Sequence, residues 1–229
     1  MIKKTTILSG IATVLLSSAS HAYEAGDIIA RVGVASVQPS KETSAPISVT
    51  GLPDSNVSGI SSDEQLGASF TYMITDHIGI EGVLSTPFET SIDVTGGVPL
   101  ATGSSNIGTA KYFPEVISLQ YYPMESSSKL QPFLGIGINY TAFFDEETSF
   151  AVNNSVAGPS TLKIDNSTGI AGQLGVDYEF KDDWIINATV WYIDLNTDAT
   201  LETTNIGTIE IENIEADPYI FFLSIGHKF

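Results

Sequence analysis

Cysteine is missing from this 229-residue chain, and basic residues are scarce. Without cysteine, neither a disulfide framework nor a thiolate metal site can form. Lysine and arginine number nine against 27 acidic residues, the net charge is −18, and Arg31 is the only arginine. A chain this acidic lacks the basic surface that nucleic acids require, so nucleic-acid binding is excluded as a function class.

Long apolar runs are missing too, apart from one near the start. Residues 7–16 form an apolar stretch that follows Lys3 and Lys4 and precedes Ser20-His21-Ala22, a small-residue cleavage pattern. The stretch is too short to span a bilayer, which takes about 20 residues. This order of charge, apolar stretch and small residues is typical of a secretory signal peptide, and a buried N-terminal helix is the alternative.

We therefore expect two parts: a cleaved signal peptide at 1–22 and a single domain at 23–229 that begins with Tyr23. No cysteine follows the predicted cleavage site, which excludes a lipoprotein anchor. The chain is hydrophobic for an exported protein, yet the domain has no helix-length apolar run. A closed β-barrel satisfies the backbone polar groups of such a chain in lipid.

Alternation of apolar and polar residues with a period of two dominates the domain. It recurs in eight segments, which we interpret as strands: 27–38, 65–74, 78–88, 112–122, 130–144, 168–180, 184–196 and 219–229. One face of each segment is apolar, and the other carries charged, amide and small residues. A soluble barrel would show the same alternation with the opposite face inside, so periodicity alone leaves both alternatives open.

Two further patterns favour a membrane barrel. The connections alternate between short links (75–77, 124–128, 181–183) and long polar ones (40–63, 89–111, 145–167, 197–217). Aromatic residues also gather at the segment ends, as in interfacial girdles: Tyr72, Tyr121, Tyr140, Phe144, Tyr178, Phe180, Trp184 and Tyr219. We predict an all-β fold, an eight-stranded antiparallel transmembrane barrel with short periplasmic turns and long extracellular loops, in the outer membrane of a Gram-negative cell.

Several segments resemble the outer-membrane protein W (OmpW) family. They are Pro132–Thr141 (PFLGIGINYT), Gly175–Tyr178 (GVDY), Trp191–Asp194 (WYID) and the end at Gly226–Phe229 (GHKF). The resemblance implies eight strands and passage of small hydrophobic compounds across the outer membrane. It also implies a role as a bacteriocin receptor in some members, and a C-terminal strand that the barrel assembly machinery recognises. The expected surroundings are outer-membrane lipid and lipopolysaccharide.

The lumen of eight strands is just wide enough for side chains or one small ligand. Parity places Val83 and Trp191 inward near mid-depth, either as the floor of an apolar pocket or as simple filling. Four polar residues also face the lumen by parity: Gln120, Asn139, Gln173 and Asn187.

A charged layer is expected near the periplasmic end of the lumen. Arg31, Glu81 and Asp177 share inward parity and a similar depth. Unpaired charge is costly in a narrow lumen, so we expect Arg31 to bond to Glu81, Asp177 or both. Such a layer would block straight passage and make a sideways exit necessary.

Four prolines lie at the outer ends of predicted strands and indicate where the wall could open. Pro87 and Pro114 lie on the neighbouring third and fourth segments, and Pro39 and Pro218 at the seam of the first and last. Each lacks an N–H for the ladder, which weakens pairing. The alternative is that the prolines merely end strands.

An enzyme is not expected, and neither is a cofactor or a metal ion. Hydrolases of this architecture need a histidine base beside a serine at the outer side. His77 and His227, the two histidines of the domain, lie at the predicted periplasmic end. The acidic segment 145–147 could hold a divalent cation, although a solvated loop is the simpler interpretation. The sequence thus leaves two function classes: a carrier of small hydrophobic molecules, or a structural, adhesive or receptor barrel with a filled lumen.

Overall fold

The computed structural model describes residues 23–39, 45–47, 55–96 and 106–229. The predicted signal peptide, 1–22, lies outside these residues. Among the residues described, no helix is both long enough and apolar enough to cross a bilayer.

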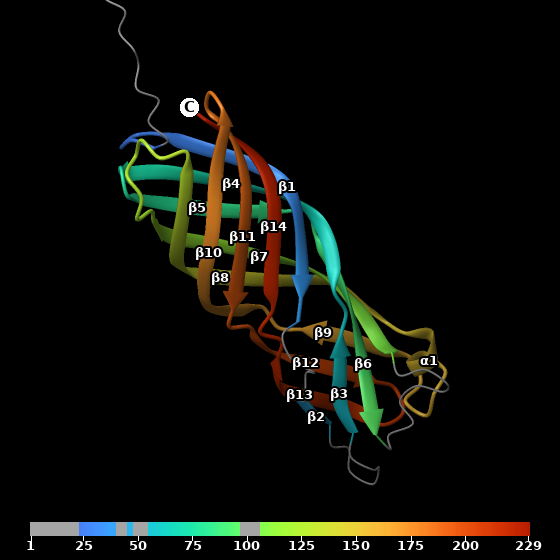
Figure 1. The fold of residues 1–229 in the computed structure, drawn as a ribbon. Helices are drawn as coiled ribbons and strands as arrows, with labels where there is room; N and C mark the ends of the chain where they lie inside the picture. The colour runs from blue at the N-terminus through green and yellow to red at the C-terminus, as the bar shows by residue number, and fades with distance from the viewer. Residues whose placement is uncertain (1–22, 40–44, 48–54, 97–105) are drawn as a thin grey trace, which may run out of the picture.

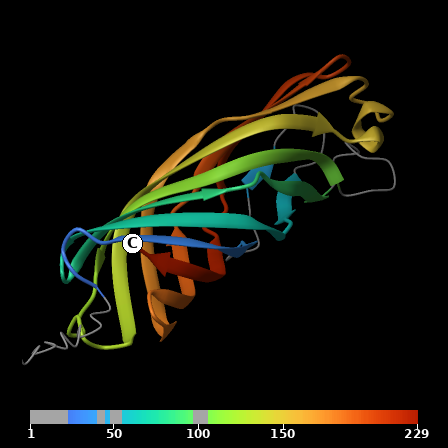
Figure 2. The same ribbon diagram turned by 90° about the horizontal axis from the view of Figure 1, so that it is seen from above.

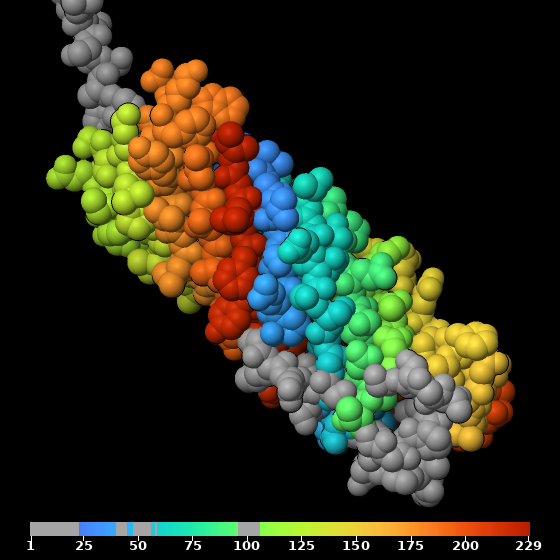
Figure 3. Space-filling view, turned by 45° about the vertical axis from the view of Figure 1, so that its right-hand side comes forward, coloured from blue at the N-terminus to red at the C-terminus, as the bar shows by residue number. Residues whose placement is uncertain are grey.

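Eight antiparallel strands close into a barrel, as the alternation predicted (Figure 1). Around the barrel they are β1 (Ile28–Gln38), β4 (Asp63–Thr75), β5 (Ile78–Ser85), β7 (Asn106–Tyr121), β8 (Leu130–Thr148), β10 (Ser167–Lys181), β11 (Trp184–Ile193) and β14 (Tyr219–Lys228). The first and last strands pair from Ile29 with Lys228 to Gln38 with Tyr219. In Figure 3 this seam appears as the red band of β14 beside the blue band of β1.

The apolar face of the barrel strands points outward, as expected for a wall in lipid. Ile136, Ile138 and Leu223 are 64–67% exposed, whereas their neighbour Asn139 is fully buried. A soluble barrel would place these side chains the other way round. The parity therefore favours the membrane alternative, because only lipid makes such an apolar outer band stable.

The long connections contain strands that the sequence analysis did not predict. They form β2 (Ala45–Ile47), β3 (Ser55–Ile60), β6 (Phe88–Gly96), β9 (Ser160–Ile164), β12 (Asn196–Thr203) and β13 (Gly207–Glu215), with the short helix α1 (Phe150–Asn153). β2, β3 and β6 extend the barrel sheet along β7, and β9, β12 and β13 form a separate sheet. Figure 2 shows β7 and β8 running on from the barrel towards these outer sheets.

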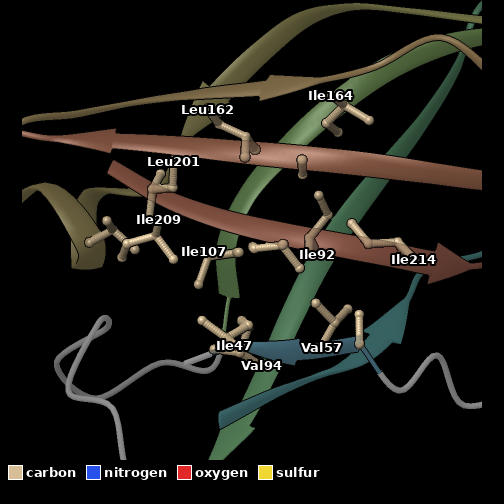
Figure 4. Packing of buried hydrophobic residues seen from close by; sticks show 14 of the residues in the cluster. Ile47, Val57, Ile92, Val94, Ile107, Leu162, Ile164, Leu201, Ile209 and Ile214 are labelled. Atoms are coloured by element: carbon tan, nitrogen blue, oxygen red, sulfur yellow. The ribbon is translucent and has the colours of Figure 1, made fainter. Parts of the chain in front are cut away.

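The outer sheets have their own apolar core (Figure 4). Its buried side chains come from both sheets and include Ile47, Val57, Ile92, Ile107, Leu162, Leu201, Ile209 and Ile211. The missed strands follow from this core, because alternating isoleucines within polar connections need a partner sheet to be buried.

The predicted segment 78–88 was wrong as a single strand. β5 ends at Ser85 and β6 begins at Phe88, and Pro87 stands between them. Proline removes a backbone donor and fixes φ, so the ladder is interrupted here. The outer strands begin beyond this point, at the end of the barrel opposite to the C-terminus (Figure 1).

Candidate functional site

A polar layer closes the lumen near the end that carries the short turns, and we call it the polar base. The Arg31 side chain of β1 is 1% exposed and donates from Nε to Oδ1 of Asp177 at 3.2 Å. Its Nη2 also donates to Asp177, and its Nη1 lies 3.5 Å from Glu81 Oε1. The structure thus brings together the three charged residues that the sequence placed in one layer. The planar guanidinium reaches two carboxylates at once, as its fork geometry allows.

Two tyrosines that the sequence reasoning missed complete the polar base. The Tyr23 hydroxyl donates to Asp177. The Tyr122 hydroxyl accepts from Arg31 Nη2 at 3.3 Å and donates to Gln120 Oε1 at 2.8 Å. Their rings meet edge to face at 5.0 Å. Tyr122 could have been found, since it follows outward Tyr121 on the same alternating segment. Tyr23 precedes the first strand, where no periodicity exists.

Amide side chains extend this network across the lumen. Gln173 donates to Glu81 Oε2 at 2.6 Å and accepts from Gln120 at 3.3 Å. Asn187 donates to Asp177 Oδ1 at 2.7 Å. Three of the four predicted lumen amides therefore belong to the polar base. The charged residues and these three amides are each at most 4% exposed, so water has little access to this level of the lumen.

An apolar cavity, which we call the inner pocket, lies further along the lumen. Its free space is small, about 20 Å³, and its lining includes Val83, Trp191, Phe88, Phe222 and Pro114. The rings of Trp191 and Phe222 are 6.0 Å apart. The structure thus places Val83 and Trp191 together in one apolar cavity of the lumen.

A second cavity, the outer pocket, lies where the barrel meets the outer sheets. Its free space is about 50 Å³, and it is lined almost wholly by carbon, with Val57, Ile60, Tyr112, Phe143 and Leu195 among its walls. A lining of this kind favours an apolar group over a polar one.

A stack of three aromatic rings separates the two pockets. Phe88 lines the inner pocket, and Tyr112 and Phe143 line the outer one. The ring centroids are 5.6 Å apart for Phe88 and Tyr112 and 5.7 Å apart for Tyr112 and Phe143.

The barrel wall is interrupted beside the inner pocket, at a place we call the break. The ladder of β5 with β7 ends at Val83 and Val116, and that of β6 with β7 begins at Phe88 and Tyr112. Pro87 and Pro114 both lie within the unpaired stretch. The Asn139 amide donates to the Glu115 carbonyl at 2.9 Å, next to the last paired residue. The fourth lumen amide therefore satisfies backbone at the break and is separate from the polar base.

The seam beside Pro39 and Pro218 is different. Pairing of β1 with β14 continues to Gln38 and Tyr219, the residues next to these prolines. The weakened pairing predicted there is not found. Both prolines lie just beyond the end of the ladder, so neither interrupts it. Both line the outer pocket.

The histidines lie where the sequence placed them, at the end with the short turns. His77 Nδ1 is 2.8 Å from the Tyr122 carbonyl oxygen, and His227 packs edge to face on Trp184 at 5.0 Å. In the part of the chain that the structure describes, no three acidic or histidine side chains gather into a group that could hold a metal ion.

Comparison with known proteins shows a full-length similarity. The family model described as the OmpW family matches residues 24–229. The chain is 39% identical over 227 residues to outer membrane protein W of Salmonella typhimurium, covering 99% of this chain and 100% of that protein.

Solved structures agree. The crystal structure of the outer membrane protein OprG from Pseudomonas aeruginosa has a TM-score of 0.80 and 33% identity, covering 92% of this chain and 98% of that one. The NMR structure of E. coli outer membrane protein W has a TM-score of 0.58 and 33% identity, covering 90% and 100%.

Proposed function

This chain belongs to the OmpW family of outer-membrane barrels, and we propose that it binds small hydrophobic molecules and passes them through the outer leaflet, releasing them sideways into the bilayer. The observation that carries the proposal is the order of features along the axis. Two apolar pockets lie above the polar base, and beside the inner pocket β7 changes its partner from β5 to β6, which leaves residues 84–87 and 113–115 without a ladder between them.

The energetics of this order are simple. A small apolar solute gains about 25 cal/mol for each Å² that leaves water, so the outer pocket concentrates it from dilute solution. The inner pocket offers the same surroundings once the aromatic stack moves. Beyond it, the polar base offers only bonded charges and amides, which an apolar solute cannot replace. Moving through the break into lipid costs the solute no apolar contact.

An uptake measurement tests the proposal. Cells lacking the gene and cells expressing the protein should be given n-octane and, separately, glucose. We expect faster accumulation of octane with the protein and no change for glucose. Equal octane rates in both strains would reject transport.

A second candidate is a structural, adhesive or receptor barrel, and one observation favours it. Large buried side chains fill much of the lumen around the inner pocket, including Phe88, Tyr112, Trp191 and Phe222. The ordered outer sheets would then serve as a platform for a bacteriocin or another surface partner. Unchanged octane uptake, combined with bacteriocin sensitivity that depends on the outer sheets, would favour this candidate.

Other partners are also proposed. The outward apolar band contacts outer-membrane lipid, and we propose contact with lipopolysaccharide at its outer edge. The C-terminal residue, Phe229, exchanges backbone hydrogen bonds with Ile28 at 2.8 and 3.1 Å. That placement at the closing seam supports a role of the last strand in recognition by the assembly machinery.

A further inference from the structure

The lipid-facing wall of the barrel is not evenly covered, and one hollow lies beside the break. This hollow, which we call the outward groove, includes Gly82 of β5 in its lining and has about 540 Å³ of free space. Its outward-facing lining consists of Ile28, Phe70, Tyr72, Ile80, Leu84 and Ile117, with Glu115 at one edge.

Glycine at position 82 creates the outward groove. Gly82 pairs with Phe70 on one side and Ile117 on the other, and both of those side chains are exposed. A Cβ added at Gly82 would meet nothing within 4 Å. Glycine in the interior of a strand lowers the stability of that strand. The stability of β5 therefore does not explain why position 82 lacks a side chain.

The outward groove and the inner pocket share two wall residues. Val83 and Leu84 line both cavities, the inner pocket also reaches Ser85 and Pro114, and the outward groove reaches Glu115. These are the residues at which pairing of β5 with β7 ends. One cavity therefore lies on each side of the unpaired wall.

We propose that the outward groove is the receiving site for solute that leaves the inner pocket through the break, and that its occupant is an uncharged hydrocarbon. The inference rests on the proposed transport function. A hollow in the wall gives an emerging solute carbon contacts with the strands before any lipid chain has to be displaced. The class of solute follows from the lining, since its walls are carbon and the Glu115 carboxylate at its edge disfavours anions.

Filling the outward groove without touching the lumen tests the proposal. Gly82→Leu puts a side chain into the hollow. Gly172→Leu is the matched control, because Gly172 also faces outward on β10 with nothing within 4 Å of its Cβ and lies away from the break. Octane uptake should fall about tenfold in Gly82→Leu, the effect of losing some ten heavy-atom contacts on the exit path, and remain at the wild-type rate in Gly172→Leu.

Ile117→Trp provides a second way to fill the outward groove, from its opposite wall, and should produce the same defect if Gly82→Leu assembles poorly. Loading of the inner pocket is followed separately in a Trp184→Phe background, in which Trp191 is the remaining tryptophan. Quenching of Trp191 by 1-bromooctane should be as strong in the Gly82→Leu protein as in its parent, because the lumen is unchanged.

The outcomes are distinct. Octane uptake that does not depend on the wild-type protein rejects the proposed function itself. Transport by the wild type that is unchanged in both groove-filling variants overturns the receiving site alone. Equal slowing in Gly82→Leu and Gly172→Leu also overturns it, because a general disturbance of lipid packing would then explain the result.

Discussion

Arg31 holds the polar base together through contacts with two carboxylates. The side chains of Arg31, Glu81 and Asp177 are each 2% exposed or less. Removing one partner of such a buried set leaves uncompensated charge, so we expect Arg31→Ala to lower the free energy of unfolding by about 3–5 kcal/mol. Urea titration of the protein folded in lipid vesicles measures this.

A surface pair supplies the comparison for Arg31. Lys163 and Glu202 are 3.2 Å apart with side chains 62% and 54% exposed. Lys163→Ala should cost only about 0–1 kcal/mol, because solvent screens such pairs. Similar losses for both variants would contradict the role we assign to the polar base.

A substitution at Trp191 can distinguish a role in packing the barrel from a role in solute transport. Within the described structure its Nε1 has no hydrogen-bond partner, so Trp191→Phe removes no bond. We expect the unfolding free energy to fall by less than the roughly 3–5 kcal/mol of a truncation to Ala, because Phe keeps most of the buried ring. Octane uptake should nevertheless change, because the inner pocket changes shape. A parallel loss of stability and of uptake would argue that Trp191 only fills the barrel.

At the scale of the element, the break depends on proline. Restoring a backbone donor with Pro114→Ala should let pairing of β7 extend towards β5, narrow the break and slow octane uptake several-fold. Pro218→Ala is the control, because the seam beside it is already paired to its end. Backbone hydrogen exchange at residues 113–116 should slow in the first variant alone, and faster uptake in Pro114→Ala would refute this account.

The barrel strands were predictable from the sequence, whereas the outer strands were not predicted. A strand in lipid needs an apolar residue at every second position, and β14 has one from Tyr219 to Ile225. β13 also alternates, at Ile209 and Ile211, but a polar connection with two isoleucines gives no sign of the sheet that buries them. The amide and charged lumen residues followed from parity and depth. The outward groove did not, because a glycine on an apolar face is visible only when its cross-strand neighbours are known.

At the scale of the whole molecule, the core of the outer sheets and the cluster around Trp191 are distinct apolar clusters, and Ile60 and Phe143 pack against both. We expect Leu201→Ala to cost the outer sheets about 2–5 kcal/mol, since Leu201 is 1% exposed. Hydrogen exchange should then speed up in β9, β12 and β13 while the barrel strands keep their protection. If the barrel strands lost their protection from hydrogen exchange together with the outer sheets, the two parts would unfold as one cooperative unit.

The sealed base also determines the thermodynamics of uptake. Nothing in the proposed path couples to a gradient or to a chemical reaction, so the protein can change only how fast a greasy compound equilibrates between medium and membrane. The final partition coefficient must be the same with and without it, and release must accelerate as much as capture. Cells that consume the compound inside would profit from the faster supply, and cells that do not would only reach the same saturation sooner.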